Sequence, residues 1–247
     1  MKKQPYISIA GRKIGRDYPP LVIAEIGINH NGDIEKAKQM IRDAKATGAE
    51  MVKFQCHVVE DEMVPAAQKT IPANSTFSIY EIMQRCAFSE AQDRELKKLT
   101  ESLGMIYLCT PFSREAANRL EKMRVVAYKI GSGECNNYPL VEHIARFGKP
   151  IIVSTGMNDV KSIKHTVSIF KKHRIQFAIL HCTNVYPTPY NKVNLGGLVE
   201  MQRAFPGAVT GISNHSLGPW AVLGAVALGA SIIERHFTSD KSWPGED

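Results

Sequence analysis

Short apolar runs rich in valine and isoleucine recur along the chain, separated by longer amphipathic stretches. A strand buried on both faces of a parallel sheet gives such a short run, and its crossover helix gives the amphipathic stretch after it. The pattern predicts eight strands, over Val22–Ile26, Met51–Gln55, Ile106–Thr110, Ala127–Gly131, Ile151–Thr155, Phe177–Cys182, Val209–Ser213 and Ile232–Phe237. Eight strands that alternate with helices fit a closed (β/α)8, or TIM, barrel, so we expect an α/β fold.

Capping signals agree with helices between the runs. Asp33 is a typical N-cap residue before the amphipathic stretch that comes after the first strand. Ser89 and Gln92 form a capping box before another such stretch, and Pro219 is typical of the first turn of a helix. These signals predict where helices of the barrel begin.

Two stretches do not fit the alternation of strand and helix. Residues Tyr6 to Arg16 alternate as a short hairpin, whose Ile7, Ile9 and Ile14 would plug the floor of the barrel. Residues Val58 to Ser78 form a connection that is too long for a plain loop between strand and helix. We expect the hairpin to be structural and the long connection to form a partial lid.

Length and hydropathy favour one barrel domain over residues 1–247. A TIM barrel takes about 250 residues, close to the 247 of this chain. The longest nearly apolar run, Trp220 to Ile233, is shorter than the roughly 20 residues that cross a bilayer, and the N-terminus lacks the apolar region of a secretion signal. We therefore expect no membrane segment and a cytoplasmic location.

The balance of charge is basic, with 31 Lys and Arg against 24 Asp and Glu, for a net charge of +7. Such an excess attracts either a nucleic acid or a small anionic substrate. The chain has no run of five basic residues, which favours the small anion over a nucleic acid. The 5 cysteines include no C-x-x-C pair, so neither a disulfide framework nor a structural zinc site is expected.

Charged residues interrupt three of the apolar runs. Glu25, Lys53 and Lys129 each lie inside one, where a charge is unfavourable to bury without a partner or a ligand. The active site of a TIM barrel lies at the carboxyl ends of its strands, where these residues would gather. They either form structural ion pairs at the barrel mouth or belong to a site, and three together favour a site.

Small residues end two of the predicted strands, as Gly131-Ser132-Gly133 and Ser154-Thr155-Gly156. Backbone amides and hydroxyl groups approach an anion closely at such positions, and Lys53 and Lys129 nearby would make phosphate a suitable anion. Turns also use glycine and serine widely, so it is the place of these strings at strand ends that favours a phosphate site.

Two histidines lie on the last two predicted strands, in Ser213-Asn214-His215 and Glu234-Arg235-His236. Neighbouring strands lie about 4.8 Å apart, so both imidazoles can bind one divalent ion and leave positions open for water or substrate. The alternative is a pair of hydrogen-bonded histidines in a polar barrel mouth. His30 and His181 also lie at strand ends and would orient other groups.

Taken together, the strings of the chain resemble the sialic acid synthase family, the phosphoenolpyruvate-condensing enzymes that make N-acetylneuraminate and related nonulosonic acids. The matching strings run along essentially the whole chain: Ala24-Glu25-Ile26-Gly27 to Asn31-Gly32-Asp33, Lys53-Phe54-Gln55, Tyr128-Lys129-Ile130-Gly131-Ser132, Ser154-Thr155-Gly156-Met157, His181 to Pro189, Ser213 to Gly218 and His236-Phe237-Thr238. So many ordered motifs are far more specific than any one of them.

The resemblance implies a transferase that joins phosphoenolpyruvate to the open-chain aldehyde of an N-acyl amino sugar and releases phosphate. It implies a manganese or magnesium ion held by His215 and His236. The implied phosphoenolpyruvate contacts map onto Lys53, Thr110, Lys129, Ser132, Ser154, Asn184 and Ser213, and the implied sugar contacts and proton-transfer groups onto Glu25, Gln55, Glu134, Tyr186 and Asp247. The predicted catalytic residues among them are Glu25, Glu134, Lys53 and Lys129.

The resemblance also implies a further region beyond the barrel. Family members continue through a last helix and a linker to a small antifreeze-like domain, which supplies an arginine to the partner subunit of a homodimer. The sequence ends at Asp247, before any of these parts. The resemblance therefore implies a fragment, a trimmed form or a product with a separate partner, and a homodimer for the full-length protein.

Two other functions stay open. A Schiff-base aldolase of the same fold, with Lys129 or Lys53 as the covalent nucleophile, would also act on a pyruvate-like substrate. A basic barrel that binds nucleic acid or serves as a scaffold would instead use the net charge of +7. Borohydride trapping, metal dependence and salt-sensitive binding to nucleic acid distinguish these functions from the synthase.

Overall fold

The barrel is seen in a computed structural model that describes residues 4–72 and 75–243. Its strands are β3 (Leu21–Gly27), β4 (Met51–Cys56), β5 (Ile106–Pro111), β6 (Tyr128–Ile130), β7 (Ile151–Ser154), β8 (Phe177–Cys182), β9 (Val209–Asn214) and β10 (Ile232–His236). They form one sheet in the order β5-β4-β3-β10-β9-β8-β7-β6, in which every hydrogen-bonded pair is parallel. The two end strands, β5 and β6, lie against each other and bring the barrel near to closure. The predicted TIM barrel is confirmed, and each strand lies within one residue of its expected ends.

The N-terminal hairpin closes the end of the barrel at which the strands begin, which we call the floor; the opposite end, where the strands finish, is the mouth. Strands β1 (Tyr6–Ile9) and β2 (Arg12–Gly15) pair in antiparallel fashion. Ile7, Ile9 and Ile14 are buried in one cluster with inward apolar residues from the lower ends of the barrel strands. The prediction that the hairpin plugs the barrel floor is confirmed, and the floor is a packed apolar core.

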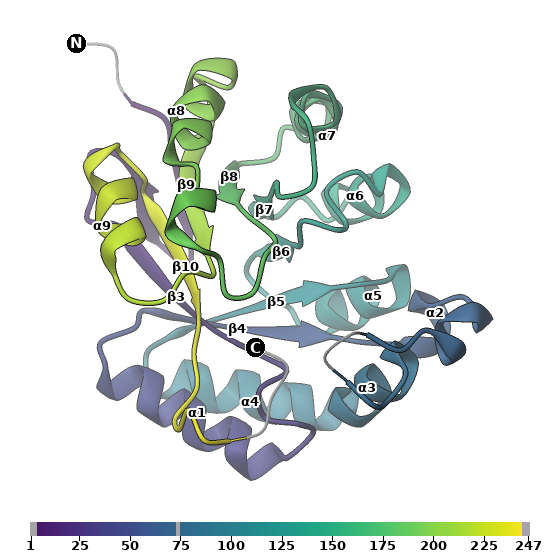
Figure 1. Cartoon of the computed structure of the whole chain (residues 1–247). Helices are drawn as coiled ribbons and strands as arrows, with labels where there is room; N and C mark the ends of the chain where they lie inside the picture. Colours follow the sequence, from purple (N-terminus) through teal and green to yellow (C-terminus); the bar gives the residue numbers. More distant parts are fainter. Residues whose placement is uncertain (1–3, 73–74, 244–247) are drawn as a thin grey trace.

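Helices surround the strands (Figure 1). The outer layer contains α1 (Ile34–Ala46), α4 (Glu90–Ser102), α5 (Arg114–Lys122), α6 (Tyr138–Ala145), α7 (Val160–Lys172), α8 (Leu195–Ala204) and α9 (Trp220–Ala227), with a short η2 turn (Tyr190–Lys192) before α8. Asp33 caps α1, and the capping box of Ser89 and Gln92 opens α4, as the sequence predicts. Pro219 stands at the cap position just before α9, one residue earlier than the expected first turn.

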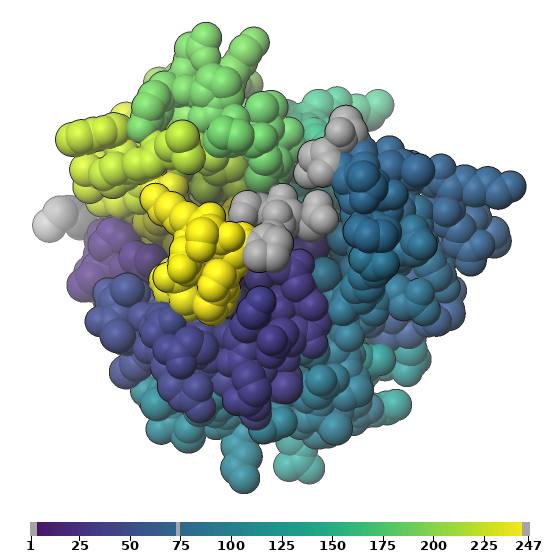
Figure 2. All heavy atoms as spheres, turned by 60° about the horizontal axis from the view of Figure 1, so that its bottom comes forward, coloured from purple at the N-terminus to yellow at the C-terminus, as the bar shows by residue number. Residues whose placement is uncertain are grey.

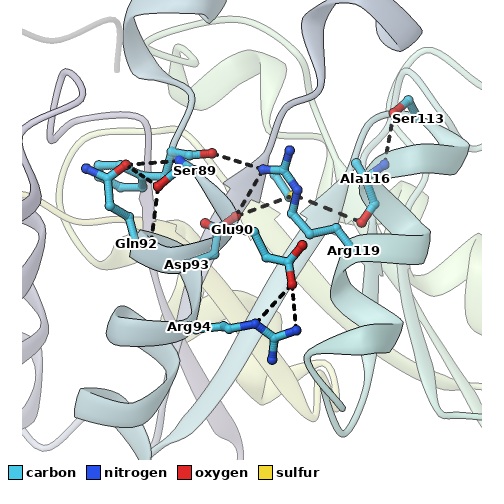
Figure 3. Close-up of polar contacts among 10 residues, drawn as sticks. Ser89, Glu90, Gln92, Asp93, Arg94, Ser113, Ala116 and Arg119 are labelled. Atoms are coloured by element: carbon cyan, nitrogen blue, oxygen red, sulfur yellow. Dashed lines mark hydrogen bonds and ion pairs between the residues drawn. The ribbon is translucent and has the colours of Figure 1, made fainter.

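A buried ion pair joins two of these helices. Arg119 of α5 reaches Asp93 of α4 at 3.5 Å and donates a hydrogen bond to the Phe88 carbonyl at 3.0 Å (Figure 3). Burial outweighs the attraction of Arg119 and raises the pKa of Asp93 to about 7. The helix layer therefore holds a carboxyl group that titrates near neutral pH outside the barrel interior.

The long connection after β4 folds into short helical pieces. It contains α2 (Val59–Glu62) and η1 (Pro65–Lys69), and it leads to α3 (Ile79–Cys86). A Cβ at Gly32 would lie 2.2 Å from the Arg85 carbonyl oxygen, so only glycine lets the loop after β3 pack on the end of α3. The connection is thereby held beside the upper end of β3, and its role as a lid stays a prediction.

The last described residues lie on the outside of the barrel. Figure 2 shows this C-terminal segment, in yellow, against the blue-purple segment that contains α1, and Lys36 Nζ of α1 lies 5.3 Å from the ring centroid of Trp243. Asp247, a predicted sugar-binding residue, lies outside the described residues. Across the ranges that are described, no helix has both the length and the apolar character needed to span a membrane.

Candidate active site

Along each barrel strand, one inward side chain is apolar and the next inward side chain, two residues later, is polar. Successive residues of a strand point to opposite faces, so residues two apart share a face. On β4 the inward Met51 is followed by Lys53, and on β10 the inward Ile232 is followed by Glu234. The same step delivers polar side chains from every strand to the upper barrel, namely Glu25, Lys53, Thr110, Lys129, Ser154, Cys182, Ser213 and Glu234.

Two lysines and two glutamates form the centre of this layer. Lys53 Nζ lies 2.8 Å from Glu25 Oε1 and 3.9 Å from Glu234 Oε2, and Lys129 Nζ lies 3.5 Å from Glu234 Oε1. Each of the four residues is at most 5% exposed. We call Glu25, Lys53, Lys129 and Glu234 the buried quartet. The charges that interrupt the apolar runs are thus brought together as ion pairs.

Burial and neighbouring charges shift the pKa values of the quartet in different directions. Burial raises the pKa of Glu25 in spite of the attraction of Lys53. Burial opposes ionisation of Glu234 too, but Lys129, Lys53 and a hydrogen bond of 3.0 Å from the Ser213 hydroxyl outweigh it and lower the pKa to about 2. Burial lowers the pKa of Lys129, whereas for Lys53 the two glutamates outweigh burial and raise it. Glu234 is therefore the firmly ionised member, and Glu25 is the carboxyl group that holds a proton more readily.

Hydroxyl and amide groups gather beside Lys129 at the ends of β6, β7 and β8. Lys129 Nζ donates to Ser154 Oγ at 2.7 Å, and the Gly156 N–H donates to Ser132 Oγ at 3.1 Å. A Cβ at position 156 would lie 1.9 Å from Asn184 Oδ1, so only glycine allows this close approach. We call Lys129, Ser132, Ser154, Gly156 and Asn184 the anion cradle.

Two more predicted substrate residues are tied to the other end of the quartet. Lys53 Nζ donates to Thr110 Oγ1 at 3.3 Å, and Gln55 Nε2 donates to Glu25 Oε1 at 3.5 Å. The side-chain oxygen of Gln55, Oε1, lies 2.9 Å from Nε2 of the buried His57 ring. The positions of Gln55 and Glu25 are therefore fixed from both sides.

The predicted metal ligands lie side by side above the quartet. The rings of His215 and His236 are 5.1 Å apart, and the Tyr186 ring lies 4.0 Å from that of His215. The Thr183 carbonyl lies 3.0 Å from His215 Nδ1, so this nitrogen donates a proton and Nε2 presents a lone pair. A neighbouring pair of imidazoles suits a divalent ion with open positions. Within the described ranges, no group of three or more His, Cys, Asp and Glu residues is placed to hold a metal ion.

A cavity of about 380 Å³ opens beside this histidine pair. It is lined by Tyr186, His215, Arg235, His236 and Lys241, among others. Its cationic and aromatic lining suits a polar organic ligand beside the histidine pair.

The comparison with known families identifies the barrel. The model of the NeuB family matches residues 40–247. The chain belongs to the NeuB family. Relatives of the chain are named as synthases of sialic, legionaminic and pseudaminic acids, so the chain is an enzyme of the synthase class.

Named relatives support the same assignment. Human N-acetylneuraminate-9-phosphate synthase is 38% identical over 96% of this chain and 67% of its own length. The N,N'-diacetyllegionaminic acid synthase of Campylobacter jejuni is 37% identical over 92% of this chain and 70% of its own. The solved N-acetylneuraminic acid (sialic acid) synthetase of Leptospira borgpetersenii, in complex with citrate, is 31% identical and superposes with a TM-score of 0.90, over 98% of this chain and 81% of that chain. The chain spans about two thirds of the length of the two curated relatives.

Three predicted or candidate residues of this NeuB-family barrel lie apart from the quartet. The half-buried Glu134 accepts a hydrogen bond of 2.6 Å from the Asn137 side chain. His30 stacks on Phe88 at 4.2 Å, and burial lowers its pKa to about 4, so it is a neutral packing residue. His181 Nε2 bonds the Val193 carbonyl at 2.8 Å, on the outer side of β8. His30 and His181 therefore contact the segments that lead into the outer helices, and neither points toward the quartet.

The sequence analysis missed Glu234 as a site residue. The string Glu234-Arg235-His236 drew attention to its histidine alone. The signal was present, because Ile232, Glu234 and His236 share one face of the strand. An inward carboxylate is also what two buried lysines require as a partner.

Proposed function

We propose that this NeuB-family barrel condenses phosphoenolpyruvate with the open-chain aldehyde of an N-acyl amino sugar, to form a sialic or related nonulosonic acid and phosphate. The observation that carries the proposal is the buried quartet beside the anion cradle, with the histidine pair directly above it. The names of the relatives, which include sialic, legionaminic and pseudaminic acid synthases, supply the class of product.

Phosphoenolpyruvate carries a phosphate and a carboxylate, and the upper barrel offers a cation for each. Lys129, Ser132, Ser154 and Asn184 would bind the phosphate, since they form the anion cradle. Lys53, with Thr110 beside it and Ser213 across the barrel, would bind the carboxylate. Charge-assisted hydrogen bonds in a buried site are stronger and shorter than neutral ones, which gives both lysines a large share of the affinity.

His215 and His236 would hold a manganese or magnesium ion. When bound there, the ion would polarise the sugar aldehyde and make its carbon more electrophilic. The Thr183 carbonyl fixes the tautomer of His215. Tyr186, Gln55, Glu134 and Asp247 are the proposed contacts of the sugar.

The reaction forms a carbon–carbon bond to the aldehyde carbon and a carbon–oxygen bond from water to C2, and it breaks the carbon–oxygen bond between C2 and phosphate. C3 of phosphoenolpyruvate attacks the aldehyde carbon, which leaves a cationic centre at C2. Water adds to C2, and the tetrahedral species releases phosphate by C–O cleavage. Glu25 or Glu134 takes the proton of that water or protonates the former aldehyde oxygen to give the new hydroxyl group, and the raised pKa of Glu25 suits a group that takes up a proton. Buried lysines stabilise the phosphate and carboxylate throughout.

A phosphate-release assay tests the proposal. The chain is supplied with phosphoenolpyruvate, Mn²⁺ and a panel of sugars that includes N-acetylmannosamine and diacetamido-dideoxy sugars. We expect release that requires both a sugar and the metal and that stops with EDTA. Release without any sugar, or none with the whole panel, would contradict it.

A Schiff-base aldolase is the competing function, because the lowered pKa of Lys129 also suits an amine nucleophile. Treatment with pyruvate and borohydride would leave a stable adduct on that lysine in an aldolase. We expect the mass of the protein to be unchanged. We also propose that the enzyme acts in the cytoplasm and that it forms a homodimer when full-length. Sedimentation measurements would test the homodimer.

A further inference from the structure

The loops after β6 and β7 are joined by a side chain that no motif singled out. Asn158 lies in the turn between β7 and α7. Its Nδ2 donates to the Ser132 carbonyl at 2.8 Å and to the Gly156 carbonyl at 2.7 Å. We infer that Asn158 is a positioning residue, which sets the spacing of Ser132 and Gly156 and so keeps the anion cradle in the shape that binds phosphate. This inference rests on the proposed function.

Both carbonyls belong to residues that also form the cradle. The Gly156 N–H donates to Ser132 Oγ at 3.1 Å, so the two residues are joined by this bond and by the bridge through Asn158. Asn184 packs directly on Gly156, a residue that the bridge holds. A shift of the bridge would therefore move the groups contributed by Ser132, Gly156 and Asn184 together.

The turn that carries Asn158 needs such a bridge. Met157 has a φ of 62°, a left-handed conformation that is unfavourable for a residue with a Cβ. Its side chain is 72% exposed, so packing does little to hold it. The backbone bond of the turn, from Asn158 N to the Thr155 carbonyl, is long at 3.3 Å. The two bonds of the Asn158 side chain are the shorter restraints on this strained turn.

The chemistry of the bridge requires an amide. Both partners are carbonyl oxygens, so the side chain must present two N–H groups, and a carboxylate of the same shape would set oxygen against oxygen. Asn158 Oδ1 is buried and finds no hydrogen-bond partner among the described residues. A buried acceptor without a partner is destabilising, so the residue is a poor choice for stability alone.

Anion binding by substituted chains tests the inference. Calorimetry with inorganic phosphate and with phosphoenolpyruvate would compare the wild type with Asn158→Ala, Asn158→Asp and Asn158→Gln. We expect both anions to bind at least about tenfold more weakly to the alanine variant and weaker still to the aspartate variant, because small displacements of positioned groups have such effects. The glutamine variant keeps the two donors on a longer stem and should lose less.

Asp159→Ala is the matched control, since Asp159 caps α7 next to the bridge and takes no part in the cradle. We expect it to lower thermal stability while both anions bind as to the wild type. In turnover, Asn158→Ala should raise the KM for phosphoenolpyruvate and leave the KM for the sugar unchanged, a split that a general loss of folding would not produce.

The outcomes separate the inference from the proposed function. A wild-type chain that binds neither anion would overturn both. A wild type that binds, with Asn158→Ala and Asn158→Asp binding equally well, would overturn the inference alone. Equal loss in the Asp159→Ala control would also overturn it, since the effect would then track stability.

Discussion

On β7, Ile152 and Ser154 point into the same barrel, two residues apart, and both are almost wholly buried. Ile152 packs in the apolar floor with the hairpin, whereas Ser154 accepts a hydrogen bond from Lys129. The floor and the mouth thus differ in the partners of their side chains and share the same degree of burial. The degree of burial therefore does not distinguish the core of this barrel from its candidate site. The two regions are distinguished by the neighbouring side chains, which are apolar in the floor and polar or charged in the mouth.

Substitutions in the floor and substitutions in the mouth should therefore affect different properties of the protein. Loss of a floor side chain removes packing and leaves a cavity. Loss of a mouth side chain removes a hydrogen-bonding or charged group from the anion or the metal and little packing. Measurements of stability and of ligand affinity on the same variants distinguish the two effects.

The largest effect is expected in the floor. Ile152→Ala should lower the free energy of unfolding by about 2–5 kcal/mol, because it empties space in a closed core. Its affinity for phosphoenolpyruvate should stay at the wild-type value. Ser154→Ala is the control on the same strand, and denaturant unfolding with calorimetry measures both variants. A floor variant that loses affinity but no stability would break the comparison.

The helix layer supplies a buried carboxyl group outside the floor and the mouth. The pKa of Asp93 is raised from 3.8 to about 7, so the folded state holds this proton more tightly than the unfolded chain does. Its contribution to stability is fully present below about pH 4 and is lost as the pH rises through about 7, by about 1.4 kcal/mol per pH unit across that window.

Asp93→Asn cannot titrate and should lack this dependence. Wild type should therefore lose stability relative to Asp93→Asn as the pH rises from 4 to 7, as measured by unfolding at several pH values. Parallel curves for the two proteins would show that Asp93 is not the titrating group.

Lysines of the mouth should control anion affinity. Lys53→Met keeps the aliphatic stem and deletes the charge, which should weaken phosphoenolpyruvate binding about 10- to 150-fold, or about 1.5–3 kcal/mol. Lys129→Met should act in the same range. The control is Lys98→Met on the exposed side of α4, which changes the net charge equally and should bind normally. Intact binding by Lys129→Met would rule out the anion cradle.

The smallest effect expected is at the histidine pair. His236→Ala should lower Mn²⁺ affinity at least about tenfold while the protein stays folded, because a side chain at the mouth contributes little to the core. His173→Ala, at the end of α7, is the control. Titration calorimetry gives both affinities, and an unchanged value for His236→Ala would count against the metal site.

The barrel was predictable because its strands are buried on both faces. Apolar runs such as Ile151 to Ser154 stand out between amphipathic stretches, and the polar residue that ends each run marks the mouth. Alternate residues of a strand share a face, and this rule, applied to β10, also predicts that Glu234 points into the barrel. It was missed because the neighbouring histidine offered a simpler explanation of the string.

Other parts of the site depend on contacts that no local pattern records. Asn158 bonds backbone carbonyls, one of them in a loop 26 residues earlier, and that approach exists only in the folded chain. His181 begins one of the matching strings, yet it faces the helix layer, because residues one position apart on a strand point to opposite sides. Side-chain direction at a strand end decides such cases, and it is set by tertiary packing.

The paired charges of the quartet also determine how strongly it attracts an anion from solvent. When Glu25, Lys53, Lys129 and Glu234 are all ionised, two positive and two negative charges cancel, and the field of such a group falls off more steeply with distance than that of a single ion. An anion in solvent therefore meets little long-range pull from the quartet itself. The excess of 31 basic over 24 acidic residues is what attracts it, and salt screens that attraction beyond about 8 Å. The speed of encounter is thus a property of the surface, while discrimination between anions begins only once one has reached the lysines.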